Sequence, residues 1–101
     1  MQTRSGGEGM TFFIRPRQDF TLSRMADAMR CLVCCDFYPA MHVYKEDKKP
    51  SIIFGVGIGV DSNDKHLCEK AIATLVDLEH FNRNNFRIIE LSPAEIVAEV
   101  D

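Results

Sequence analysis

Tryptophan is absent from this 101-residue sequence, tyrosine occurs only twice, and positive charge is not in excess. The 12 Lys and Arg residues stand against 15 Asp and Glu residues, which gives a net charge of −3. Proteins that bind nucleic acid by displacing counterions usually present a positively charged face, so this balance argues against that class. The sequence also lacks any apolar run near the ~18–20 residues of a membrane-spanning helix. We therefore expect a protein that neither spans a membrane nor has a general affinity for nucleic acid.

Cysteine is also scarce, with 4 residues in the chain. A disulfide-stabilised secreted scaffold is usually shorter, poorer in core residues and preceded by a signal sequence. Here 46% of the residues are hydrophobic, and Met1–Gly9 is polar and glycine-rich, without the apolar middle segment of a signal. We therefore expect reduced thiols and a cytoplasmic location.

Residues 1–9 differ in composition from the rest of the chain. Gly6-Gly7-Glu8-Gly9 can be encoded by a purine-rich stretch resembling a bacterial ribosome-binding site, and Met10 follows it directly. We expect a disordered leader over 1–9 and a single domain over 10–101. Our hypothesis is that Met10 is the natural start and that the source is a bacterium, phage or mobile element.

After Met10, hydrophobic residues alternate between the period of strands and the period of helices. Strands are predicted at Thr11–Arg15, Tyr38–Glu46, Ser51–Val60 and Phe86–Leu91. Helices are predicted at Thr21–Cys34 and Leu67–Phe81, with caps at Thr21 and among Asp61, Ser62 and Asp64. Ser92-Pro93-Ala94-Glu95 combines a capping box with proline at the first helical position. It predicts a short terminal capping helix over 92–101.

This order, βαββαβ followed by a helix, predicts a ferredoxin-like α+β fold. Its four-stranded antiparallel sheet would carry two helices on one face, with the first and third strands in the centre. Pro39 suits an edge position for the second strand, because proline cannot donate a ladder hydrogen bond. The residues expected to face inward from the two helices are Leu22, Met25, Ala26, Met29 and Val33, and Leu67, Cys68, Ala71, Leu75 and Leu78.

The third predicted strand has an unusual distribution of glycine. The residues expected to point toward the helices are Ile52, Phe54, Val56, Ile58 and Val60. The opposite face of the strand carries Ile53, Gly55, Gly57 and Gly59. Glycine weakens a strand, because it loses more backbone entropy on folding and offers no side chain to pack. The pattern indicates that another group lies close to the main chain on that face.

Three explanations of the glycine face are compatible with the sequence. Aromatic residues of the adjacent strand, Tyr38 and Tyr44 with His42, could pack over the glycines. A partner protein or a second copy could dock there, because apolar, aromatic and arginine-rich patches are enriched at interfaces. Bases could stack on the rings while arginines hold phosphates; the arginines concerned are Arg15, Arg17 and Arg87.

The sequence favours a small, non-enzymatic protein-binding or regulatory module, acting as a homodimer or on a partner through this face or an edge strand. The expected interaction residues are Phe13, Arg15, Tyr38, His42, Tyr44, Ile53, Gly55, Gly57, Gly59 and Arg87. One alternative is a dimeric α/β-barrel-type enzyme or ligand-binding protein with His42 beside Tyr44 as the acid or base. Another is an RNA- or ssDNA-binding sheet. The sequence contains no phosphate-loop or dinucleotide motif, and we expect no cofactor.

Cys31, Cys34 and Cys35 are grouped at the C-terminal end of the first predicted helix. The helix dipole disfavours a thiolate at this end. A zinc site needs four convergent ligands, usually as two separated pairs, and only one close group is present. We therefore expect structural or surface thiols and no metal site, with Cys68 as a small core residue.

Overall fold

The computed structural model describes residues 11–17, 19–48, 51–60, 64–78 and 81–100. Its strands are β1 (Thr11–Pro16), β2 (Pro39–Lys48), β3 (Ser51–Val60), β4 (Phe86–Leu91) and β5 (Ile96–Val100). Its helices are α1 (Leu22–Cys34) and α2 (Lys65–Asp77), with the short 3-10 helices η1 (Arg83–Asn85) and η2 (Pro93–Glu95). The leader predicted over 1–9 lies outside the described residues.

Both α-helices begin at residues that cap their first turn. Thr21 Oγ1 accepts a hydrogen bond from the Arg24 amide at 3.1 Å, and Asp64 Oδ1 accepts one from the His66 amide at 2.8 Å. These contacts satisfy amides that have no partner within the helix. The N-cap predicted at Thr21 is confirmed, and the second cap is Asp64.

The C-terminal end of α1 is closed by a Schellman motif. The Phe37 amide donates to Leu32 O at 2.9 Å, and the Asp36 amide donates to Val33 O at 3.1 Å. This geometry places Asp36 at φ 70°, where glycine is the usual residue because side chains are strained. The motif turns the chain from α1 into β2.

The sheet is antiparallel, with the strand order β4-β1-β3-β2-β5. The fold is therefore α+β and compatible with a ferredoxin-like arrangement. Two expectations are wrong. The sheet has five strands rather than four, and β2 lies inside it because β5 pairs with β2 over Met41–Tyr44. Pro39 has no amide hydrogen to donate to a neighbouring strand. This does not weaken the pairing with β5, because β5 pairs with β2 only from Met41 onward.

The C-terminal capping helix predicted over 92–101 is replaced by η2 and β5. The predicted capping box does form: Glu95 Oε1 accepts from the Ser92 amide at 2.8 Å. The helix stops after one turn, because the following Ile96-Val97 pair is β-branched and the outer edge of β2 offers hydrogen-bond partners. The capping motif predicts the start of the helix correctly, but strand pairing determines the structure of the rest of the segment.

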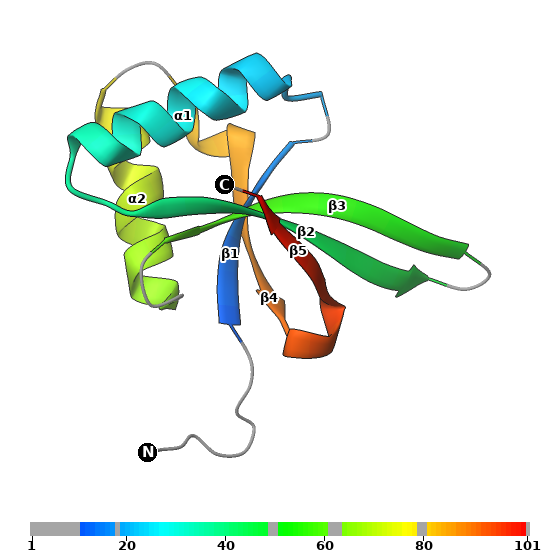
Figure 1. Ribbon diagram of the computed structural model, residues 1–101. Coiled ribbons are helices and arrows are strands. Elements are labelled where there is room, and N and C mark those ends of the chain that lie inside the picture. The colour runs from blue at the N-terminus through cyan, green and yellow to red at the C-terminus, as the bar shows by residue number, and fades with distance from the viewer. Residues whose placement is uncertain (1–10, 18, 49–50, 61–63, 79–80, 101) are drawn as a thin grey trace, which may run out of the picture.

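The sheet curls toward the face opposite the helices. Adjacent strands lie about 4.8 Å apart, so β4 and β5 would be about 19 Å apart in a flat sheet. Only residues 92–95 separate these two strands in sequence, and a 3-10 helix advances only about 2 Å per residue. The outer strands must therefore approach each other at η2, as Figure 1 shows.

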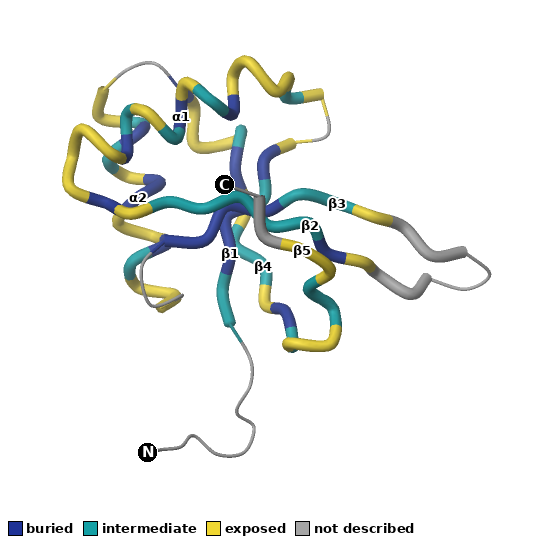
Figure 2. The backbone as a smooth tube through the Cα atoms, in the orientation of Figure 1, coloured by how far each residue is buried: buried dark blue, intermediate teal, exposed yellow. Residues whose placement is uncertain are grey.

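The larger core lies between the helices and one face of the sheet (Figures 1 and 2). From α1 it receives Met25, Ala28 and Leu32. Leu22 and Val33, predicted to face inward, are 71% and 60% exposed. The apolar face of α1 is broad. The sequence prediction centred the buried part of it toward Leu22 and Val33, whereas the buried residues are Met25, Ala28 and Leu32. Of the residues predicted to face inward from α2, Cys68, Ala71 and Leu75 are buried, and Ile72, which was not predicted, is buried as well. Leu78 follows the end of the helix and is 40% exposed.

A second, smaller core fills the concave face of the curled sheet. Phe13, Tyr44 and Leu91 are buried there, and the partly buried Ile89 and Ile96 pack against them. Ile96 reaches this core because of a β-bulge. Val43 pairs with Ala98 and Tyr44 pairs with Ile96, which leaves Val97 as the extra residue. Val97 is 52% exposed, so the bulge determines which of the two neighbours is buried.

Two glycines of β3, Gly55 and Gly57, leave space for the aromatic residues of this second core because they have no side chain. A Cβ atom at Gly55 would lie 2.6 Å from Cζ and Oη of Tyr44, and one at Gly57 would lie 3.2 Å from Phe13 Cβ. Tyr44 is the cross-strand neighbour of Gly55, and both aromatic residues are fully buried. At Gly55 the packing explanation of the glycine pattern is therefore confirmed, with Tyr44 as the covering residue; at Gly57 the covering residue is Phe13 of β1, which that explanation did not include.

Candidate interaction surface

The expected interaction residues separate into buried and accessible groups. Phe13 and Tyr44 have no exposed surface, and Gly57 and Gly59 are buried. The expectation that Phe13, Tyr44 and Gly57 form an open surface is wrong, because they lie within or beneath the chain's own second core. The side chain of Ile53 lies outside the described residues.

Tyr38 and His42 lie at the border of the covered region. His42 is half-buried, with its ring edge-on to Phe13 at 4.8 Å between centroids. Its Nδ1 lies 3.2 Å from Ala40 O. Tyr38 precedes β2 and is 77% exposed. The barrel-type alternative uses His42 beside Tyr44, but in this chain the Phe13 ring packs against His42 and Tyr44 is fully buried.

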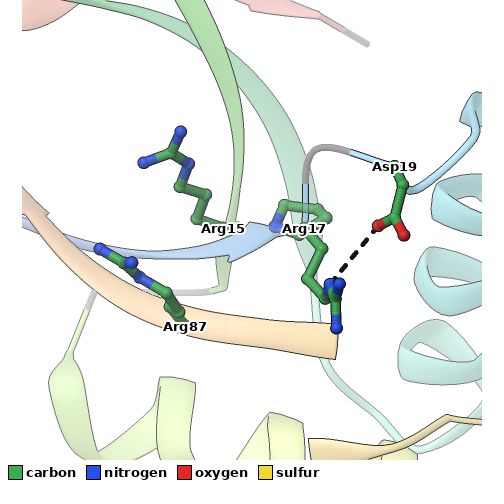
Figure 3. Close-up of a pocket in the computed structure, with 5 residues that line it drawn as sticks. Arg15, Arg17, Asp19 and Arg87 are labelled. Atoms are coloured by element: carbon green, nitrogen blue, oxygen red, sulfur yellow. Dashed lines mark ion pairs between the residues drawn. The ribbon is translucent and has the colours of Figure 1, made fainter. Parts of the chain in front are cut away.

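The accessible part of the concave face carries arginine. Arg15 and Arg87 are cross-strand partners on β1 and β4, and their side chains extend in the same direction in Figure 3. Together with Pro16, Arg17 and Asp19 they line a pocket of about 450 Å³, here named the arginine pocket. Arg17 turns toward Asp19, with Nε 3.5 Å from Oδ1 (Figure 3). Three guanidinium groups thus surround one pocket in a chain of net charge −3.

An apolar groove of about 260 Å³ adjoins the arginine pocket and shares Arg15, Pro16 and Arg17 with it. Its other lining residues are Phe20, Leu22, Met25, Phe54, Gly55 and Val56. Leu22 is 71% exposed and Phe54 is 63% exposed. Large apolar side chains exposed together beside charged residues are typical of interaction sites.

Sequence reasoning missed the apolar groove because it assigned both exposed residues to the core. Leu22 was expected on the inward stripe of α1, and Phe54 was expected to point toward the helices. Phe54 instead lies where the hairpin of β2 and β3 extends past its neighbours: the pairing of β2 with β5 ends at Tyr44, opposite Gly55. Alternation along a strand gives the side of the sheet but does not show where the covering helices end.

The thiol cluster lines a different groove, of about 730 Å³, along α1. Cys34 and Cys35 are exposed and Cys31 is half-buried. The charges in this groove are engaged within the chain. Arg30 forms an ion pair with Asp27, and the Arg24 guanidinium lies 5.0 Å from the ring centroid of Phe81.

The described part of the chain contains no candidate metal site. No three His, Cys, Asp or Glu side chains in it are grouped closely enough to hold a metal ion. Cys68 is fully buried, as expected for a core residue. Its Sγ donates to Phe12 O at 3.5 Å. Burial, with the negative charges of Asp64 and Glu69, raises the pKa of the Cys68 thiol from 9.0 to about 11. This thiol is therefore protonated at neutral pH and is a poor nucleophile.

Comparison with known proteins adds no assignment: neither the protein-family models, nor the curated proteins, nor the solved structures give a match to this chain. Among the described residues, no helix is long and apolar enough to cross a membrane.

Proposed function

We propose that this protein is a non-enzymatic protein-binding module whose binding surface is the apolar groove together with the arginine pocket. The partner segment places an apolar side chain between Leu22 and Phe54 and a negatively charged group at the arginines. The observation that carries the proposal is the exposure of these two large side chains over one groove, whose wall includes Arg15 and Arg17.

Energetic reasoning supports this choice of surface. Leaving a leucine or phenylalanine in water forgoes about 1.5–3 kcal/mol per side chain relative to full burial. A partner that covers both side chains recovers part of that free energy. The adjacent arginines add selectivity, because they attract a negatively charged partner segment during encounter and repel a positively charged one. A complementary partner segment is therefore both apolar and acidic.

The second core argues against the two alternative functions. A base-stacking sheet needs accessible rings, and Phe13 and Tyr44 are fully buried. An acid or base at His42 needs a pocket for a substrate, and the space beside it holds the Phe13 ring at 4.8 Å. The apolar groove and the arginine pocket lie outside this packed region, so protein binding there needs no rearrangement of the core.

The proposal is tested with paired surface variants in an affinity capture from the source cell. Leu22→Gln with Phe54→Thr removes both apolar side chains, using a good helix former and a good strand former. Val33→Gln with Val97→Thr is the matched control, because these residues are 60% and 52% exposed and lie outside the groove. We expect a partner that the wild type and the control capture and the groove variant loses.

Two results would contradict the proposal. Equal capture by all three proteins would show that the groove is not the binding surface. Retention of a nucleic acid that nuclease treatment removes would assign the arginines to phosphodiesters instead. Sedimentation of the purified protein identifies the case in which the partner is a second copy of the chain; the groove variant is then a monomer and the control a dimer.

A further inference from the structure

The ladder between β1 and β3 fixes which way the main chain of β3 points beside the apolar groove. The Arg17 amide donates to Asn85 O at 2.9 Å, which continues the pairing of β1 with β4. Main-chain groups of successive residues in an antiparallel strand point to opposite neighbours. Those of Ile14 and Pro16 therefore point toward β3, where Ile14 pairs with Ile58. The main-chain groups of Ile58, and of every second residue before it in β3, point back toward β1.

Pro16 ends this ladder. In the same register Pro16 stands opposite Val56, and proline has no amide hydrogen to donate to the neighbouring strand. β1 stops at Pro16. The chain then turns away from the sheet, and the Phe20 amide donates to Arg17 O at 3.0 Å. The part of β3 that precedes Val56 therefore extends beyond the end of β1.

The main-chain N–H and C=O of Phe54 face this open side. Phe54 lies two residues before Val56, so its main-chain groups point in the same direction, away from its β2 neighbour Lys45. None of the described strands lies opposite Phe54 on that side. The hairpin of β2 and β3 extends past β1 there, as Figure 1 shows, and Phe54, Gly55 and Val56 line the apolar groove. An open strand edge thus forms one wall of the groove.

The other strand edges that the described chain leaves open carry charged residues, a common protection against pairing with another molecule. The outer strand β4 contains Arg87 and Glu90, and the outer strand β5 contains Glu99. The part of β2 beyond its pairing with β5, Lys45–Lys48, is charged at every position. The corresponding part of β3, Ser51–Gly55, contains no charged residue and no proline. An uncharged edge of this kind pairs readily with a further strand.

We propose that the partner binds as an extended segment that pairs with the open edge of β3, as an additional strand of the sheet in line with β1. This inference rests on the proposed function and specifies the conformation and the main-chain contacts of the partner segment. In such complexes main-chain hydrogen bonds give affinity, and pockets for alternate side chains give specificity. Every second side chain of the added strand enters the apolar groove between Leu22 and Phe54, and the side chains between them lie on the sheet face that carries Arg15.

Charge complementarity indicates which kind of strand is added. The wall of the groove contains Arg15 and Arg17, which attract acidic residues of an incoming segment. The same edge of a second copy of this chain would bring only the uncharged residues of Ser51–Gly55. The added strand is therefore assigned to a different protein, in a segment that alternates apolar with acidic residues.

The first test is amide hydrogen exchange in the ¹⁵N-labelled full chain, free in solution. The Phe54 amide should exchange close to the rate of an unstructured peptide. The Gly57 amide, which points toward β2, should exchange at least tenfold more slowly. Protection of Phe54 equal to that of Gly57 would overturn the inference. If that protection increases with protein concentration, a second copy covers the edge; if it does not, the chain itself covers it.

The second test adds a short synthetic peptide that alternates valine with glutamate. Two modified forms carry N-methyl groups on every valine or on every glutamate, which blocks hydrogen bonding along one edge of the peptide only. At saturation the unmodified peptide should slow exchange of the Phe54 amide at least tenfold. One methylated form should bind as the unmodified peptide does, and the other should lose binding. No effect at Phe54, or equal binding of all three peptides, would overturn the inference.

The groove variant, Leu22→Gln with Phe54→Thr, separates this inference from the proposed function, with Val33→Gln and Val97→Thr as the control. If the wild type binds all three peptides equally and the groove variant binds none, the groove binds partners and strand pairing is wrong. If one methylated form fails to bind the wild type and the groove variant binds the unmodified peptide as tightly as the control, strand pairing stands and the proposed function fails. A circular dichroism spectrum identical to that of the wild type confirms that each variant is folded.

Discussion

Replacing Gly55 by alanine tests the packing of the second core. The added Cβ would lie 2.6 Å from two ring atoms of Tyr44, far inside a normal carbon contact of about 3.5–4.0 Å. Tyr44 has no exposed surface, so its ring cannot move into solvent to relieve the contact. The neighbouring strand or the ring itself must shift within a packed core.

Two opposing contributions determine the expected magnitude. Overpacking a closed site typically costs about 1–3 kcal/mol. Alanine recovers about 0.5–1 kcal/mol in a strand, because it loses less backbone entropy than glycine. The net expectation for Gly55→Ala is a destabilisation of about 1–2 kcal/mol. For a domain of this size, each 1 kcal/mol lowers the melting temperature by about 4–8 °C.

The assay is urea unfolding of a double-mutant cycle with Tyr44→Leu. Leucine has no atoms at the positions of Cζ and Oη, so Gly55→Ala should be neutral or slightly stabilising in that background. The expected coupling free energy is at least about 1 kcal/mol. Gly57→Ala is a useful contrast. Its neighbour at 3.2 Å is the Phe13 Cβ, which every residue except glycine retains, so Phe13→Leu should give no rescue.

The reasoning is refuted if Gly55→Ala is as stable as the wild type, or if its cost is unchanged in the Tyr44→Leu background. Either result would mean that the Tyr44 ring does not lie over Gly55. The concave face would then be open, and the sheet would offer the broad surface that the sequence first suggested.

Three further predictions concern other parts of the structure. Asp36→Gly should raise the free energy of unfolding by about 0.5–1 kcal/mol, because a side chain at positive φ is strained; urea unfolding measures this. Ile96→Ala should cost about 1–2 kcal/mol, whereas Val97→Ala should stay within about 0.5 kcal/mol, because the β-bulge buries only the former; equal costs would contradict the register. The Cys68 pKa is about 11 in the folded chain and 9.0 ordinarily, so its contribution to stability is complete below about pH 9 and is lost as the pH rises to about 11. Wild type and Cys68→Ala should therefore converge in stability over that range in alkaline unfolding titrations.

Local signals in the sequence predicted the elements up to β4 well. The cap at Thr21, the bounds of β4 at Phe86 and Leu91, and the burial of Cys68 each depend on neighbouring residues. Periodicity also placed Phe13, Arg15, Tyr44 and Arg87 on one face of the sheet. These features follow from backbone hydrogen bonding and strand alternation, which a short stretch of sequence encodes.

Features that depend on distant segments were not predicted. The start of the 92–101 segment has helix-capping chemistry, yet it becomes a strand because β2 has an edge to pair with. Closing the curled sheet then buries Phe13 and Tyr44, which a flat sheet would expose. Leu22 and Phe54 were expected to be buried and are exposed, because neither lies beneath the facing layer. The candidate surface was missed for the same reason.

Hydroxyl-radical footprinting of the native protein, read by mass spectrometry, compares the covered face and the candidate surface in one experiment. The two tyrosines provide an internal comparison, because Tyr38 is 77% exposed and Tyr44 is fully buried. We expect rapid modification of Tyr38, Leu22 and Phe54, and protection of Tyr44 and Phe13 until the protein is unfolded. Modification of Tyr44 and Phe13 at the rate of Tyr38 would contradict the account, since the glycine face would then be open to solvent.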